Sequence, residues 1–221
     1  MKWTIPNILT TLRLLAAPAV PVMFLYFHRP WADWFALALF VSAAITDYFD
    51  GYLARLWKQE SKFGTMLDPI ADKAMVVIAL LILTGYSGMN PWLILPATVI
   101  LFREVFVSGL REYLGSASGT LKVTKLAKWK TTAQMVAIAV MFLGTGLEYL
   151  NGVAMQGMTP EQYAEAVTAG LADPIRACGK QDCASYANVL GLVLIWIAAI
   201  LTALTGLEYF RKSLPLLQEE K

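Results

Sequence analysis

Four aspartates lie at the flanks of two long apolar runs, at Asp47, Asp50, Asp68 and Asp72. A charge at such a place is costly unless it is paired or bound to a cation. On helical geometry Asp47 and Asp50 are i,i+3 neighbours and Asp68 and Asp72 are i,i+4 neighbours, so each pair shares a face. A turn between the two helices would bring the four carboxylates to one point. Such hard oxygen donors favour one or two divalent cations, with water and phosphate oxygens completing the shell.

Small residues and one arginine accompany the aspartates. Gly51, Ala54 and Gly64 lie on the same expected faces, which would let a planar or bulky ligand approach the backbone. Arg55 supplies a guanidinium that can donate two parallel hydrogen bonds to a phosphate. An acidic loop solvated among lysines would explain neither the helical spacing nor the small residues. The pattern therefore predicts a cation-assisted site for a phosphorylated ligand.

The elements that must position these residues are apolar helices. The chain has 221 residues, of which 57% are hydrophobic and 15% charged, and its mean hydropathy is +0.56, which is too apolar for an ordinary soluble domain. We expect one all-α domain over residues 1–221, a polytopic membrane helix bundle whose active site lies at the cytoplasmic ends of its second and third helices. About six membrane-spanning helices are expected, several of which reach ~20 residues only if their polar flanks are helical. The apolar runs are Leu9–Phe27, Trp34–Thr46, Met75–Tyr86, Pro91–Leu110, Thr131–Leu147 and Val189–Leu207.

Charge predicts the orientation. With a cytoplasmic N-terminus, all of the 18 lysines and arginines except Arg29, Arg176 and Lys180 fall on the inner side, as the positive-inside rule requires. The aspartates then face the cytoplasm. The first apolar segment has no small-residue cleavage pattern, so we expect a retained helix and not a signal peptide. His28, the single histidine, would lie on the opposite side as a surface residue.

Polar residues in two other apolar segments need an explanation. Asn7, Thr10 and Arg13 recur every three residues and share a helix face, which capping or anchoring at the membrane surface could explain. Arg103 and Glu104 interrupt an apolar segment, and an ionisable residue at that depth is functional or paired by default.

Basic residues follow along the same segment. Arg111 lies eight residues after Arg103, so the two arginines project to similar faces. Lys125 and Lys128 come next in the chain. The positive-inside rule explains the lysines but explains Arg103 poorly.

The spacing Asp47-x2-Asp50-Gly51-x2-Ala54-Arg55-x8-Gly64-x3-Asp68-x3-Asp72 resembles, without a departure, the signature of the CDP-alcohol phosphotransferases. These are integral membrane enzymes of phospholipid synthesis. Pro6-Asn7-x2-Thr10-x2-Arg13 looks like the amino-terminal motif of the same family, and residues 103–112 with 125–135 look like those members whose acceptor carries its own phosphate. The resemblance covers roughly residues 3–148 and the final helix.

The resemblance implies a reaction in a bacterial inner membrane. CDP-diacylglycerol would be the donor and glycerol 3-phosphate the acceptor, giving phosphatidylglycerophosphate and CMP, in a homodimer without a nucleic-acid partner. Two Mg²⁺ or Mn²⁺ ions would be held by the four aspartates, with Asp68 bridging both ions and Asp72 acting as general base. The donor would contact Asn7, Thr10, Gly51, Ala54, Arg55, Ser61 and Gly64. The acceptor phosphate would contact Arg103, Arg111, Lys125 and Lys128, with Lys130 as a further candidate.

Other functions stay open at this point. A sister enzyme would use serine, inositol phosphate or phosphatidylglycerol as acceptor, although an acceptor without a phosphate does not need the cations. A non-catalytic divalent-cation transporter would use the same acidic cluster but leaves Arg55 unexplained. Ser61 is either a phosphate or ribose contact or an ordinary loop residue.

The resemblance fails from Asn151 to Asn188, and we expect an outer-side insertion at about residues 149–188. Thr159 and Pro160 favour a helix over Glu161–Leu171. Cys178 and Cys183 are the only cysteines. A disulfide is permitted on the outer side and is favoured over a metal site, because no histidine accompanies them.

Overall fold

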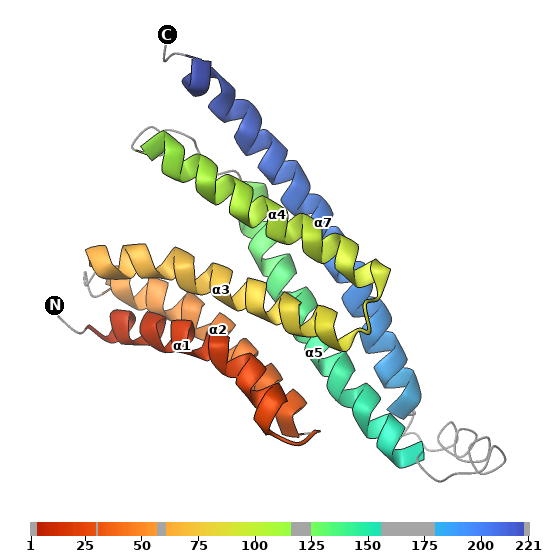
Figure 1. Ribbon diagram of the computed structural model, residues 1–221. Coiled ribbons are helices and arrows are strands. Elements are labelled where there is room, and N and C mark those ends of the chain that lie inside the picture. Colours follow the sequence, from red (N-terminus) through yellow and green to blue (C-terminus); the bar gives the residue numbers. More distant parts are fainter. Residues whose placement is uncertain (1–3, 30, 57–60, 116–124, 156–179, 219–221) are drawn as a thin grey trace. The chain divides into compact units, whose positions relative to one another are not determined.

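The computed structural model describes residues 4–29, 31–56, 61–115, 125–155 and 180–218. Within these ranges the backbone alone is described at residues 6, 47–56, 62, 125–128, 151–155, 180–185 and 218. The described residues form α-helices and include no strand (Figure 1). The helices are α1 (Ile5–Tyr26), α2 (Trp31–Leu56), α3 (Lys62–Tyr86), α4 (Pro91–Leu114), α5 (Lys125–Met155) and α7 (Lys180–Gln218). The all-α prediction is confirmed.

Four of these helices contain segments long and apolar enough to cross a membrane, at residues 7–26, 91–114, 129–150 and 186–217. The apolar part of α2 is shorter, at residues 31–46, but α2 continues as helix to Leu56. Likewise α3 begins at Lys62, well before its apolar run. The polar flanks that carry the aspartates are therefore helical, as the length argument required, and the chain is a polytopic membrane protein.

Local signals account for where α4 begins and ends. The side chain of Asn90 accepts a hydrogen bond from the amide of Trp92 at 3.0 Å, and proline occupies the first turn. Gly115 ends the helix at φ 49° and ψ −123°, a positive-φ conformation that glycine adopts without steric cost.

The chain divides into two compact units, each described here by itself. The first comprises residues 1–79 and 138–191. In it α1 packs along α2, and Phe142 of α5 contacts Phe24 of α1 and Phe40 of α2, with ring centroids 6.1 and 5.8 Å apart. Figure 1 shows α1, α2 and the first half of α3 side by side. Phe40 and Phe142 are almost fully buried, so they form the centre of this unit.

The second unit comprises residues 80–137 and 192–221. Its main feature is α4 packed along α7. The rings of Trp92 and Trp196 are 6.2 Å apart, and the Trp196 indole donates to the carbonyl oxygen of Trp92 at 2.9 Å. Phe106 contacts Phe210 at 5.6 Å. These paired aromatic contacts keep α4 and α7 together over several turns.

The expected insertion is helical at both ends. Helix α5 continues to Met155 and α7 begins at Lys180, although the apolar runs stop at Leu147 and start at Val189. Polar helix-forming residues extend a helix beyond its apolar stripe, so the hydrophobic pattern alone makes these two helices too short at these ends. The helix expected over Glu161–Leu171, and Cys178, lie outside the described residues, as does the side chain of Cys183.

Candidate functional site

The aspartates of the predicted cation site lie on α2 and α3 of the first unit. Asp47 and Asp50 lie on continuous helix, as do Gly51, Ala54 and Arg55, but the side chains of these five residues lie outside the described part. Asp68 and Asp72 are half-buried and four residues apart on α3. The predicted helical spacing of both pairs is therefore present in the backbone.

Helix α1 holds both aspartates of α3. The Thr10 hydroxyl donates to Asp68 Oδ1 at 2.7 Å, and Arg13 Nη1 donates to Asp72 Oδ1 at 3.0 Å. Thr10 and Arg13 are buried, with only 2% and 3% of their surface exposed. The side chain of Asp72 is 34% exposed, whereas that of Arg13 is 1% exposed. The polar face of α1 is thus turned toward α3, where it supports the two carboxylates from inside the helix pair.

A second contact joins the start of α3 to α1. The Ser61 hydroxyl donates to Asn7 Oδ1 at 2.8 Å and accepts from the amide of Gly64 at 3.0 Å. Ser61 therefore caps α3 in the usual manner of a serine at a helix start. A Cβ at Gly64 would lie 2.7 Å from Asn7 Oδ1. Any larger residue at this position would displace the Asn7 side chain and its bond to Ser61, a reason for glycine that the spacing of the motif alone did not reveal.

The carboxylates of Asp68 and Asp72 suit a hard divalent cation. Carboxylate oxygens are the ligands that Mg²⁺ and Mn²⁺ prefer, and α3 presents two of them within one helical turn. Among the side chains that the structure describes, no three histidine, cysteine or acidic groups converge as ligands. The other two aspartates of the set are outside that description. The cation site is therefore a prediction that the geometry of α3 and α1 supports.

The basic residues expected at the acceptor phosphate lie in the second unit. Arg103 Nη1 donates to Glu104 Oε1 at 3.3 Å, and buried Lys130 donates to the same oxygen. The guanidinium of Arg111 lies over the ring of Tyr209 on α7, 5.7 Å from its centroid. Arg103 also faces α7, at Gly206, so the two arginines share a face as their spacing predicts. The side chains of Lys125 and Lys128 on α5 lie outside the described part.

Arg29 and Asp33 form an ion pair that the sequence pattern did not reveal. Asp33, in the first turn of α2, is fully buried, and its two oxygens accept from Arg29 at 2.5 and 2.7 Å. Arg29 also donates to the carbonyl oxygen of Thr145 on α5 at 3.0 Å and lies over the ring of Tyr149. The i,i+4 spacing of Arg29 and Asp33 was the available signal. His28 is exposed, as expected.

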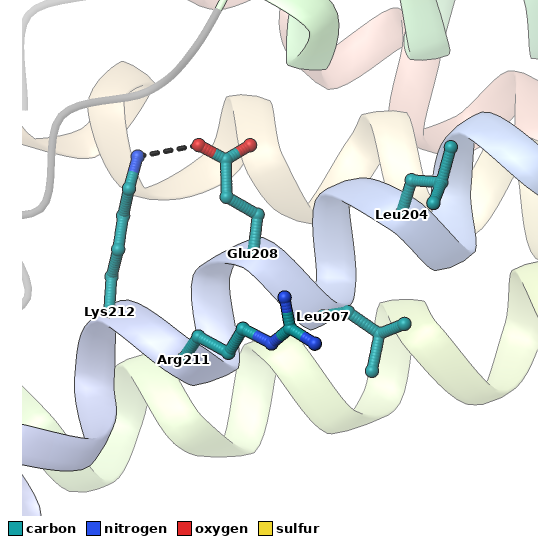
Figure 2. A pocket seen from close by; sticks show the side chains of 5 residues that line it. All are labelled: Leu204, Leu207, Glu208, Arg211 and Lys212. Atoms are coloured by element: carbon teal, nitrogen blue, oxygen red, sulfur yellow. Dashed lines mark hydrogen bonds and ion pairs between the residues drawn. The ribbon is translucent and has the colours of Figure 1, made fainter.

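A separate pocket of about 410 Å³ lies on α7 and is lined by Leu204, Leu207, Glu208, Arg211 and Lys212. Figure 2 shows Lys212 and Glu208 joined by an ion pair, at 2.6 Å between nitrogen and oxygen. This pair is half-exposed and spaced i,i+4, so it is a surface interaction of small energy. None of the residues predicted for the site lines this pocket.

Comparison with known proteins gives one consistent result. A family model described as CDP-alcohol phosphatidyltransferase matches residues 3–205. The similar proteins include several that carry the name CDP-diacylglycerol–glycerol-3-phosphate 3-phosphatidyltransferase. That of Cereibacter sphaeroides is 78% identical over the full length of both chains. That of Rickettsia bellii is 35% identical over 94% of this chain and 93% of its own, and that of Shigella flexneri serotype 5b is 36% identical over 78% of this chain and all of its own.

Proposed function

Because this chain belongs to the CDP-alcohol phosphatidyltransferase family, we propose that it transfers the phosphatidyl group of CDP-diacylglycerol to glycerol 3-phosphate, releasing CMP and phosphatidylglycerophosphate. The observation that carries the proposal is the full-length similarity to the Cereibacter relative named for this reaction. The arginines on α4, Arg103 and Arg111, are a second support, since an acceptor with its own phosphate requires positively charged side chains to bind it. We place the enzyme in a bacterial inner membrane, as a homodimer with its active site facing the cytoplasm.

The aspartates supply the chemistry at the donor. Mg²⁺ or Mn²⁺ bound by Asp47, Asp50, Asp68 and Asp72 would neutralise the diphosphate and stabilise the departing CMP. Asp72 takes the proton of the acceptor hydroxyl. At the same time the hydroxyl oxygen attacks the phosphatidyl phosphorus, and the bond from that phosphorus to CMP breaks. The bond from Arg13 to Asp72 Oδ1 fixes the orientation of this carboxylate.

The remaining residues position the substrates. Gly51 and Ala54 leave room for the cytidine, and Arg55 contacts a donor phosphate. The space beside Gly64 is taken by the Asn7 side chain, so this glycine serves the contact between α1 and α3. Asn7, Thr10 and Ser61 support the donor site indirectly. Their hydrogen bonds join α1 to α3 and so hold the two helices together beside that site. Arg103 and Arg111 receive the acceptor phosphate, with Lys125 and Lys128 adding positive charge. Lys130 is bound to Glu104 and acts through that carboxylate.

An acceptor panel with and without chelator tests the proposal. Purified full-length protein in mixed micelles with CDP-diacylglycerol and Mg²⁺ is given glycerol 3-phosphate, serine, inositol phosphate or phosphatidylglycerol, and CMP is measured. Of the four acceptors, we expect only glycerol 3-phosphate to give CMP, and we expect no CMP release after EDTA is added. CMP with another acceptor in its place would indicate a sister enzyme, and divalent-cation flux in proteoliposomes without CMP would indicate a transporter.

A further inference from the structure

Two buried hydrogen-bond donors in the second unit have no partner within the described part of the chain. They are Nε of Arg103 on α4 and the hydroxyl of Tyr209 on α7. A buried donor left unsatisfied is costly, so such groups are rare in folded proteins and require an explanation. A bound ligand with oxygen acceptors would satisfy both.

The packing of α4 against α7 brings these donors to one place. The side chain of Arg103 crosses α7 at Gly206, where an added Cβ would lie 2.8 Å from Arg103 Cγ and 3.6 Å from its Nε. Tyr209 is three residues after Gly206 and so lies on the neighbouring turn of the same face. Arg103 is within electrostatic range of Tyr209 and Arg111. The glycine therefore gives Arg103 access to the surface that carries the tyrosine hydroxyl.

The charge of this cluster selects the ligand class. Arg103, Arg111 and Lys130 supply three cations, and Glu104, which binds two of them, supplies one carboxylate. Glu208 of α7 is paired with Lys212 and lines the separate pocket on that helix. An excess of cations with two available donors fits an oxyanion with several acceptor oxygens, and a phosphate monoester has that chemistry.

We propose that Tyr209 is a binding residue for the acceptor, donating its hydroxyl hydrogen bond together with Arg103 Nε to the phosphate of glycerol 3-phosphate. The inference rests on the proposed function and adds to it a neutral donor on α7. Arg111, stacked over the Tyr209 ring, holds the ring in place through a cation–π contact. The role is one of acceptor recognition and leaves the donor and the proton transfer to the residues of the first unit.

The substitution Tyr209→Phe tests this role, because it removes the hydroxyl and keeps the ring beneath Arg111. In the full-length enzyme we expect the KM for glycerol 3-phosphate to rise about tenfold to a hundredfold, since a hydrogen bond to a charged group is lost. The KM for CDP-diacylglycerol should stay unchanged. Tyr113→Phe, at a tyrosine on α4 that is 68% exposed, is the matched control and should leave both values unchanged.

A double-mutant cycle with Arg103→Lys adds a second measurement, because lysine keeps the charge but lacks the Nε donor. If both donors bind one phosphate, the two substitutions together should cost less than the product of their separate effects. An unchanged acceptor KM in Tyr209→Phe, an equal rise in the donor KM, or strictly multiplicative effects would overturn the inference. In each of these cases the proposed function still holds if the wild-type enzyme uses glycerol 3-phosphate as its acceptor. If the wild-type enzyme does not use glycerol 3-phosphate, both the proposed function and the role of Tyr209 are overturned.

Discussion

At the level of single residues, the carboxylates of Asp68 and Asp72 each have one side bonded to α1 and one side turned away from it. Their Oδ1 atoms accept hydrogen bonds from Thr10 and Arg13 of α1, both of which are buried. The partial exposure of Asp72 leaves the other side accessible from outside the helix pair. Groups that bind a ligating carboxylate from behind fix its orientation and tune its affinity for the metal. We therefore regard the polar face of α1 as a support for the predicted cation site. It supplies no metal ligand itself.

Thr10→Val tests this supporting role. The loss of the hydroxyl bond to Asp68 should weaken Mn²⁺ binding by about tenfold to a hundredfold, which a titration followed by electron paramagnetic resonance of free Mn²⁺ measures directly. Thr11→Val is the matched control, because the Thr11 hydroxyl donates to the carbonyl oxygen of Asn7 within α1 itself. Equal Mn²⁺ affinity in the two variants would contradict the supporting role.

Asp72→Asn tests the assignment of the base. We expect CMP release to fall by about 10²-fold to 10⁴-fold, the range for loss of a general base. Asparagine retains an oxygen that accepts from Arg13, so the variant should stay folded and bind CDP-diacylglycerol. Size-exclusion chromatography and binding of a labelled donor check these two points. A turnover close to that of the wild type would rule out Asp72 as the base.

At the level of helices, Gly206 determines how closely α4 approaches α7. Gly206→Ala would place Cβ against Arg103 Cγ, and overpacking of this kind costs about 1–3 kcal/mol. We expect a lower thermal unfolding midpoint and a raised KM for glycerol 3-phosphate. Gly109→Ala on α4 is the matched control, because nothing lies within 4 Å of its added Cβ. That substitution should stabilise the helix by about 0.5–1 kcal/mol, and an equal loss of stability in both variants would contradict the packing argument.

The turn between α1 and α2 is held to α5 by Arg29 and Asp33. Asp33 is fully buried, so Asp33→Ala leaves the guanidinium of Arg29 without its carboxylate and should destabilise the fold by ~3–5 kcal/mol. Thermal unfolding in detergent measures the loss. Glu208→Gln breaks a half-exposed ion pair on α7 and should change the midpoint little. A small effect of Asp33→Ala would show that this contact is not needed to hold the turn.

The sequence predicted the helices and the shared faces well, but not which helices meet. The apolar runs located the helices, and the spacing of Asn7, Thr10 and Arg13 correctly placed them on one face. Thr10 and Asp68 are 58 residues apart in the chain, and no local pattern encodes such a contact. The pairing of Lys130 with Glu104 was hidden for the same reason, because it depends on how α5 packs against α4.

For the molecule as a whole, composition and motif spacing carry different parts of the prediction. The apolar composition predicted a polytopic membrane protein, and the helices that the structure describes confirm it. The aspartate spacing identified the family, and the match over residues 3–205 confirms that identification. The metal ions, the base and the substrate contacts stay predictions, because they concern side chains and ligands that a helix pattern does not place.

Incorporation of labelled glycerol 3-phosphate into lipid is the most direct test of the central claim. The wild-type protein in proteoliposomes with CDP-diacylglycerol should form one chloroform-soluble labelled product for each CMP released. EDTA should stop both, and Mg²⁺ or Mn²⁺ should restore both. CMP release without label in the lipid, or incorporation that is unaffected by the chelator, would contradict the proposed reaction.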